Sequence, residues 1–376
     1  MKYTAKALMS VLALSLLLVA SPVMAAEVDV MGENVDTGAD SNNQNDYELD
    51  NDVEVDVEND SDVDNEADVD ADTGDNDVEE NTNAGDLTTG VVDASAEWET
   101  VTNAGSAMMG AGEDGVMIDG EFTNDTTGAD SNNENELDFD NDVEYELDNM
   151  ADILNSLDFD ADTGDNDVEQ NTNVGAIETG DASLHSVISN WANNDSGLVG
   201  AAAQGPVVDV TATNETTGAE SNNQNEFDID SEYSFEVEND ADINNNVNVD
   251  IDTGGNNVEQ NTNSGDLKTG SAEVTVEIEN SANNGGGHSS GANAGSLDVT
   301  GNFKNDTTGF DSNNENELEV DNEVDVEIEN DADVDNDVDV DVDTGDNDVE
   351  QNTNGGSVET GDVEINLNIS NDVNSN

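Results

Sequence analysis

The chain has 376 residues, a formal net charge of −90 at pH 7, no cysteine, and four lysines as its only permanently basic side chains. This charge excludes binding to nucleic acid backbones, which needs positive charge, and predicts repulsion from anionic lipid surfaces. The same charge makes small cations the expected partners. Without cysteine the chain cannot be held by disulfides, so something else must stabilise it.

Residues 1–26 have the pattern of a secretory signal peptide. Lys2 and Lys6 precede the apolar stretch "VLALSLLLVA", and "SPVMAAE" offers small residues for cleavage after Ala25 or Ala26. A retained N-terminal anchor is the alternative. Cleavage would leave two lysines against 94 acidic residues, a charge of −92. We therefore expect a secreted protein, extracellular or at the cell surface, with no membrane insertion once the signal is removed.

A 54-residue block recurs four times without gaps, first at Thr37 and then after 90, 90 and 91 residues. The segments between blocks have two strand-like runs around a tip of small residues. "EVDVMGENVDTG" matches the second run alone, and "DVEINLNISNDVNSN" matches the first. The predicted divisions are the signal peptide 1–26, a half-connector strand 27–36, repeat 1 at 37–126, repeat 2 at 127–216, repeat 3 at 217–307, and a truncated repeat 4 at 308–376.

Strict alternation runs through each block, from Asn45 to Thr73 in the first copy and from Asn316 to Thr344 in the fourth. One parity is acidic and the other is apolar with occasional Asn, which predicts β-structure with one buried face. A straight strand of this length would span about 90 Å at about 3.3 Å per residue, far beyond ordinary strands. We therefore expect the run to bend at its inward Asn residues, with roughly 14–15 residues per rung and roughly six rungs per repeat.

Asn at such corners could satisfy backbone groups left unpaired by the bend and could bond the Asn one rung away. Ser231 could do the same in the third copy. The predicted corner residues are Asn45, Asn51, Asn59, Asn65, Asn135, Asn141, Asn149, Asn155, Asn225, Asn239, Asn245, Asn316, Asn322, Asn330 and Asn336.

The predicted fold class is all-β, a β-solenoid or β-helix of four tandem repeats of about 90 residues. A row of antiparallel β-sandwich domains, one per repeat, is the first alternative. Intrinsic disorder is the second, because the net charge is high. Two prolines in 376 residues and the β-branched alternation argue for order.

Carboxylates on one strand face lie about 7 Å apart, and stacked rungs bring others to about 4.8 Å, so their repulsion must be offset. Divalent cations could do this, and Ca²⁺ is the expected candidate because it prefers oxygen ligands. Loose cation condensation or a simple solvated face are the alternatives. The candidate Ca²⁺ ligands are Asp68, Asp70, Asp72, Asp75, Asp77, Asp158, Asp160, Asp162, Asp165, Asp167, Asp339, Asp341, Asp343, Asp346 and Asp348, and Glu350 could join the last five at a solenoid corner.

The stretch "DVDVDTGDNDVE" approaches an EF-hand loop, but its Gly is at position 7 instead of 6, so we predict no EF-hand. The third copy, "NVDIDTGGNNVE", has fewer acids. We expect no enzyme, because His185 and His288 are unmatched between copies and no nucleophile–base pair can be placed. Trp98 and Trp191 are expected to pack in the core. Glycosylation sequons occur at Asn124, Asn214 and Asn305.

The inward Asn series, Gly-containing turns and uncapped repeats resemble curlin-type amyloid β-solenoids and other repetitive secreted surface proteins. The curlin Ser–Gln–Gly–Asn–Gln spacing is absent, so no residue role is carried over. The complementary half-connectors and the lack of an obvious capping helix predict a structural protein of the cell surface or extracellular matrix, because an uncapped strand edge is a template for another chain. It would polymerise with itself into fibres or contact other surface components. A monomeric cation-binding adhesin or matrix stalk is the alternative.

Overall fold

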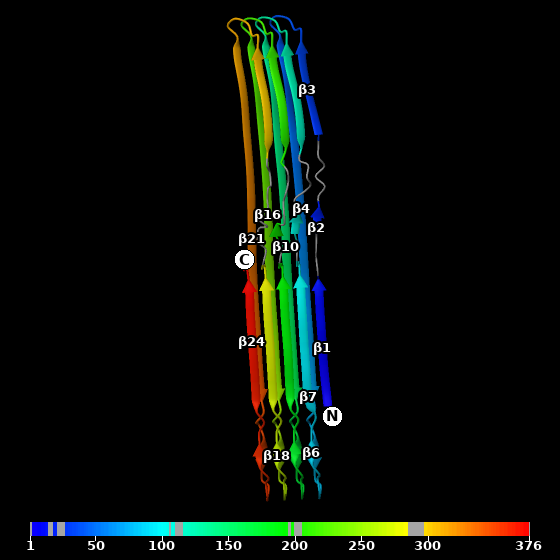
Figure 1. The fold of residues 1–376 in the computed structure, drawn as a ribbon. Helices are drawn as coiled ribbons and strands as arrows, with labels where there is room; N and C mark the ends of the chain where they lie inside the picture. The colour runs from blue at the N-terminus through cyan, green and yellow to red at the C-terminus, as the bar shows by residue number, and fades with distance from the viewer. Residues whose placement is uncertain are drawn as a thin grey trace.

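The computed structural model describes residues 2–13, 18–20, 27–104, 107–109, 116–194, 197–198, 205–284 and 297–375. These residues form a long all-β rod of parallel sheets (Figure 1), which confirms the predicted β-solenoid of tandem repeats. In this part of the chain there is no helix long and apolar enough to cross a membrane. The predicted cleavage point after Ala25 or Ala26 and the unmatched His288 lie outside the described residues.

Each repeat makes one circuit of the rod. Strand β3 (Glu27–Val35) runs to one end, and β4 (Asn42–Asp72) then runs back along the whole length. After β5 (Asp77–Glu79) and β6 (Leu87–Thr88) at the far end, β7 (Val91–Thr102) starts the return, and β9 (Met117–Asp125) completes it (Figure 1). One rung of the solenoid is therefore one whole repeat.

The later rungs repeat this order. Their strands are β10 (Asn132–Asp162), β11 (Asp167–Glu169), β12 (Ile177–Glu178), β13 (Ala182–Ala192), β15 (Val207–Glu215), β16 (Asn222–Asp252), β17 (Asn257–Glu259), β18 (Leu267–Lys268), β19 (Ala272–Ala282), β20 (Asp298–Asp306), β21 (Asn313–Asp343), β22 (Asp348–Glu350), β23 (Val358–Glu359) and β24 (Val363–Val373). In addition, β1 (Lys2–Ala13) pairs with β7, and β2 (Leu18–Ala20), β8 (Ala107–Met109) and β14 (Gly197–Leu198) form a short sheet.

Every strand pairs in parallel with its equivalent in the next repeat. Asn135 faces Asn45 and Asn225, and the same register continues to Asn316. The third and fourth rungs are offset by 91 residues, and the extra residue falls between Ala282 and Asp298. Parallel pairing between repeats rules out the alternative of separate antiparallel sandwiches, since strands of one sandwich would pair within a repeat.

The expected rungs of 14–15 residues are wrong. The long strands β4, β10, β16 and β21 each run for 31 residues without a bend. Each position pairs with its equivalent in the next copy, so the register holds however long the strand becomes. The predicted corner residues instead lie inside these continuous strands: Asn45, Asn51, Asn59, Asn65, Asn135, Asn141, Asn149, Asn155, Asn225, Asn239, Asn245, Asn316, Asn322, Asn330 and Asn336.

The core lies between the sheet of long strands and the returning strands. One cluster joins Leu157, Phe159 and their equivalents to the β7–β13–β19 sheet, and a second joins Leu137 and Phe139 to β9 and β15. Trp98 is buried in the first cluster, as expected, whereas Trp191 is only half-buried. Among the described residues, the apolar parity thus fills the interior as five clusters along the rod, and the inward Asn residues lie on the same parity.

The turns at both ends of the rod bring successive backbones very close together. A Cβ on Gly164 would overlap the carbonyl oxygen of Gly254, and a Cβ on Gly180 would overlap that of Gly90. Single residues with positive φ, such as Asp75 at 60° and Asp165 at 49°, complete the turns. Tight stacking at these points fixes how one rung sits on the next.

Candidate functional site

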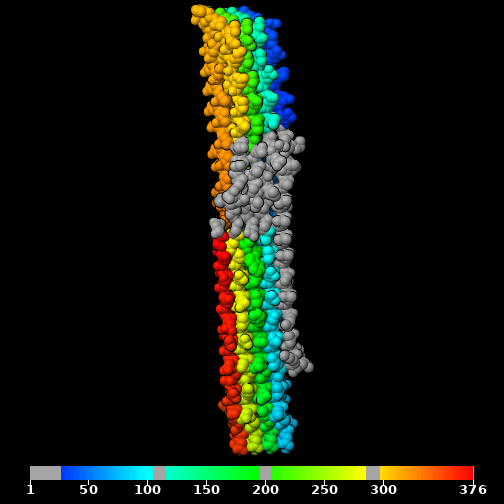
Figure 2. Space-filling model, in the orientation of Figure 1, coloured from blue at the N-terminus to red at the C-terminus, as the bar shows by residue number. Residues whose placement is uncertain are grey.

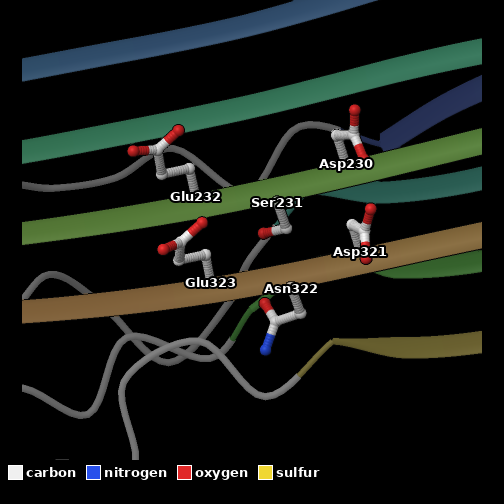
Figure 3. A pocket seen from close by; sticks show the side chains of 6 residues that line it. All are labelled: Asp230, Ser231, Glu232, Asp321, Asn322 and Glu323. Carbon is white, nitrogen blue, oxygen red and sulfur yellow. The ribbon is translucent and has the colours of Figure 1, made fainter.

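The outward face of the long strands carries columns of carboxylates. The fourteen outward positions from Asp46 to Asp72 in β4 and from Glu317 to Asp343 in β21 are all acidic. The register places each beside its equivalent in the neighbouring rung, about one strand spacing away. Figure 3 shows Asp230 beside Asp321 and Glu232 beside Glu323, while Ser231 and Asn322 point to the other side of their strands. Like charges directly opposite each other destabilise a sheet.

The two middle rungs interrupt these columns with neutral side chains. Between β10 and β16, an acidic residue pairs with an acidic residue at nine of the fourteen outward positions from Glu136 to Asp162. The neutral residues are Met150, Leu154, Ser156, Ser234, Asn244, Asn246 and Asn248. Asn248 also donates a hydrogen bond to the carboxylate of Asp158 at 3.0 Å, so repulsion there is replaced by attraction.

Burial and neighbouring acids raise several carboxyl pKa values. Desolvation first, and then Asp250 and Asp70 in the same column, raise the pKa of Asp160. Desolvation raises the pKa of Asp162 to about 6, although a backbone hydrogen bond from Gly164 opposes the shift. Protons are therefore held more firmly on this surface than on isolated carboxylates.

Two groups of three carboxylates come together in the part of the chain that the structure describes. Their ligand atoms lie within 4.8 Å of one another, and each group joins two rungs. The groups are Glu79 with Asp167 and Glu169, and Glu259 with Asp348 and Glu350. Among the predicted ligands, Asp167, Asp348 and Glu350 belong to these groups. Asp77 lies in β5, paired with Asp167. The others lie along the outward columns or in the turns that follow them.

The glutamates Glu79, Glu169 and Glu259 were not among the candidate ligands. Each comes from a "DVE" or "NVE" strand, and the two rungs that form a group are 90 or 91 residues apart. Recurrence of this tripeptide at the repeat period was the available signal. Between the second and third rungs Asn257 replaces the aspartate and donates to Asp167 at 3.3 Å and Glu169 at 3.4 Å.

Inside the rod, the Asn residues form hydrogen-bonded ladders. The Nδ2 of Asn45 donates to Oδ1 of Asn135 at 2.8 Å, and Asn135 donates in the same way to Asn225 at 2.8 Å. The prediction that an inward Asn bonds its equivalent one rung away is confirmed, although the rungs are 90 residues apart. Facing ladders also bond each other, as in the 3.0 Å contact from Asn124 to Asn135.

The asparagines of the three glycosylation sequons are members of these ladders. Asn124 and Asn214 have no exposed surface, and both side chains donate to neighbouring Asn residues. Asn305 is half-buried in the same ladder. An attached sugar would displace the ladder, so the folded form is incompatible with glycosylation at Asn124 and Asn214.

The last rung leaves its inward apolar side chains uncovered. Among the described residues, no strand pairs with the outer edges of β20, β21 and β24. Figure 2 shows this rung, in orange and red, along one edge of the rod. Its side chains that are exposed by 40% or more include Leu318, Val320, Val324, Val326, Ile365 and Leu367. An exposed edge with apolar side chains is a template for another strand.

No protein-family model, curated protein or solved structure matches this chain.

Proposed function

We propose that this protein is a secreted, acidic structural component of the cell surface or extracellular matrix, and that copies assemble end to end into fibres. The uncovered terminal rung carries this proposal, because a repeat stack without a polar cap presents the same surface that each inner rung buries. The protein would act through its surfaces and not as an enzyme.

The test uses the chain after export and removal of its leader. Electron microscopy and light scattering would follow the purified protein at neutral and mildly acidic pH, with and without millimolar Ca²⁺. We expect fibres whose diffraction has a strand spacing of about 4.8 Å along the axis. Monomers under every condition would contradict the proposal.

The two three-carboxylate groups favour a second candidate function, a monomeric cation-binding adhesin or matrix stalk. Oxygen ligands from two rungs could bind Ca²⁺ and hold the rungs together. Calorimetric titration should then show binding that is lost in the variant Asp167→Asn/Asp348→Asn, which copies the asparagine at 257. The control is Asp209→Asn, which removes an exposed carboxylate outside the two groups and should leave the binding unchanged. If the heat of Ca²⁺ titration depended only on ionic strength, this candidate function would be ruled out.

A further inference from the structure

We propose that the joint between copies is polar. The outer edges of β20, β21 and β24, called here the C-terminal end, would dock on the outer edges of β3, β4 and β7 of a second copy, called the N-terminal end. The joint would keep the parallel register that links successive repeats. This inference rests on the proposed fibre function and adds the partner surface and the direction of growth.

The apolar side chains at the C-terminal end match a contact already present three times in the chain. Leu318 is 40% exposed, whereas its equivalent Phe227 is 1% exposed beneath the fourth rung. Ile365 is 48% exposed, whereas its equivalent Val274 is fully buried. A second copy placed as a fifth rung would cover these side chains as the inner rungs are covered.

The inward Asn ladders have a direction that only one orientation of a second copy continues. In the ladder from Asn65 through Asn155 and Asn245, each Nδ2 donates to the Oδ1 of the following rung. In the first rung, the Asn side chain therefore directs its Oδ1, and not its Nδ2, toward the N-terminal end. The Oδ1 of Asn65 is buried and has no hydrogen-bond partner, which leaves an acceptor for the Nδ2 of Asn336 from a preceding copy.

The reverse orientation fails at the same ladders. Two copies joined through their N-terminal ends would bring oxygen against oxygen, and their long strands would meet in antiparallel order. Each unpaired buried acceptor costs about 1–3 kcal/mol. The exposed ladder through Asn132 and Asn222 runs the opposite way, but it too continues only in a head-to-tail stack.

The glycines define the two ends most sharply. A Cβ on Gly128, Gly218 or Gly309 would overlap the backbone of the preceding rung, whereas one on Gly38 would meet nothing within 4 Å. The opposite holds at the other turn, where a Cβ on Gly74 or Gly164 would overlap the following rung. At the equivalent Gly345, the nearest atom to a Cβ is the Oδ1 of Asp343 at 3.5 Å.

Side chains added at Gly38 or Gly345 would therefore fit the free chain and clash only with a docked copy. Strand β1 also lies along the outer edge of β7, where β24 of the preceding copy would pair. The N-terminal end is thus fully available for docking only after residues 1–26 are removed. Removal of these residues is what the signal-peptide prediction expects.

The experiment compares the processed wild-type chain with Gly38→Val, Gly345→Val and an equimolar mixture of the two variants. Urea unfolding of the monomers would verify that each variant folds with wild-type stability. Under conditions in which the wild type forms fibres, we expect each variant alone to stay monomeric. The mixture should give dimers and stop there, because one free C-terminal end and one free N-terminal end remain complementary. Analytical ultracentrifugation would resolve these species.

The outcomes separate the two proposals. A wild-type chain that never assembles contradicts the fibre function. Fibres from the wild type together with dimers from either variant alone would mean that like ends join, which overturns the polar joint. Fibres from both variants would place the contact elsewhere on the rod and would also overturn it.

Discussion

At the scale of single residues, the buried amides hold the rungs in register. Asn155 is fully buried, accepts a hydrogen bond from Asn65 at 2.8 Å, and donates to Asn245 at 2.7 Å and Asn190 at 3.1 Å. We expect Asn155→Ala to lower the free energy of unfolding by about 2–4 kcal/mol, because it removes these bonds and leaves a cavity. Urea denaturation followed by circular dichroism would measure the change.

An exposed ladder supplies the control for this prediction. Asn173 donates to Asn83 at 2.9 Å and accepts from Asn263 at 2.7 Å, but water reaches these side chains. Asn173→Ala should cost less than about 0.5 kcal/mol. If Asn155→Ala and Asn173→Ala lowered the free energy of unfolding equally, burial of the ladder would contribute nothing to stability.

The turn residue Asp165 is held in a conformation that glycine adopts more easily. Its φ is 49°, and the equivalent residue in the third rung is Gly255 with φ of 60°. We expect Asp165→Gly to stabilise the protein by roughly 0.5–1 kcal/mol, since the left-handed region costs an ordinary residue more. Asp165→Asn removes the same charge without the added freedom. If both variants gain equally in thermal unfolding, charge and not backbone strain is the cause.

At the scale of elements, the sequence predicted which face of each strand is buried but not how long the strand is. The alternation from Asn45 to Thr73 fixed the parity, because side chains alternate across a strand. The Asn spacing also suited corners of a narrow coil, so the local pattern did not distinguish the two geometries. The Asn residues bond along the stack, 90 residues away, and the same ladder would arise in either.

The repeats contained the information that separates these geometries. Recurrence without gaps over 54 residues is required if every position pairs with its equivalent, whereas a coil of short rungs would need similarity only every 14 residues or so. The single inserted residue lies in the connector between Ala282 and Asp298, outside the paired strands. The three-carboxylate groups depend on this register and could not be located without it.

The neutral side chains of β16 make an element-scale prediction. Asn248→Asp would complete a column of four acids with Asp68, Asp158 and Asp339, and would remove the hydrogen bond to Asp158. We expect the free energy of unfolding, measured with urea at low ionic strength, to fall by roughly 1–2 kcal/mol. The loss should shrink in high salt. Asn248→Ala, which removes only the hydrogen bond, separates the two causes, and a salt-independent loss would count against charge repulsion.

At the scale of the whole molecule, acid should stabilise this protein. The pKa of Asp162 rises from 3.8 to about 6 on folding. Between these pH values the folded chain binds more protons than the unfolded chain, so stability falls as pH rises through this window. The raised pKa values of Asp138, Asp152 and Asp160 act in the same direction. The urea midpoint should therefore increase from pH 7 to about pH 4. A decrease on acidification, the usual behaviour of paired carboxylates, would contradict this sign.

The same charges would control assembly, because the proposed joint is the most acidic contact on the rod. It would bring Glu317 to Asp343 of β21 against Asp46 to Asp72 of the next copy, with acid facing acid at fourteen outward positions, compared with nine between the second and third rungs. Each pair at about 4.8 Å repels by roughly 0.9 kcal/mol in water before screening. The joint would also bring Glu350 beside Asp77 and Glu79 of the next copy, repeating the three-carboxylate group found between the first and second rungs.

Fibre growth should therefore need protons or divalent cations, and neutralising the last rung should reduce that need. The triple variant Asp335→Asn/Asp337→Asn/Asp339→Asn gives β21 the asparagines that β16 carries at the equivalent positions. It removes three repulsive pairs from the joint, or roughly 2–3 kcal/mol before screening, so fibres should form at lower Ca²⁺ or higher pH than in the wild type. Glu232→Gln/Glu236→Gln/Glu238→Gln changes the net charge equally but lies one rung away from the joint. Light scattering across a Ca²⁺ series would compare them, and an equal shift in both variants would mean that total charge, and not the joint, sets the threshold.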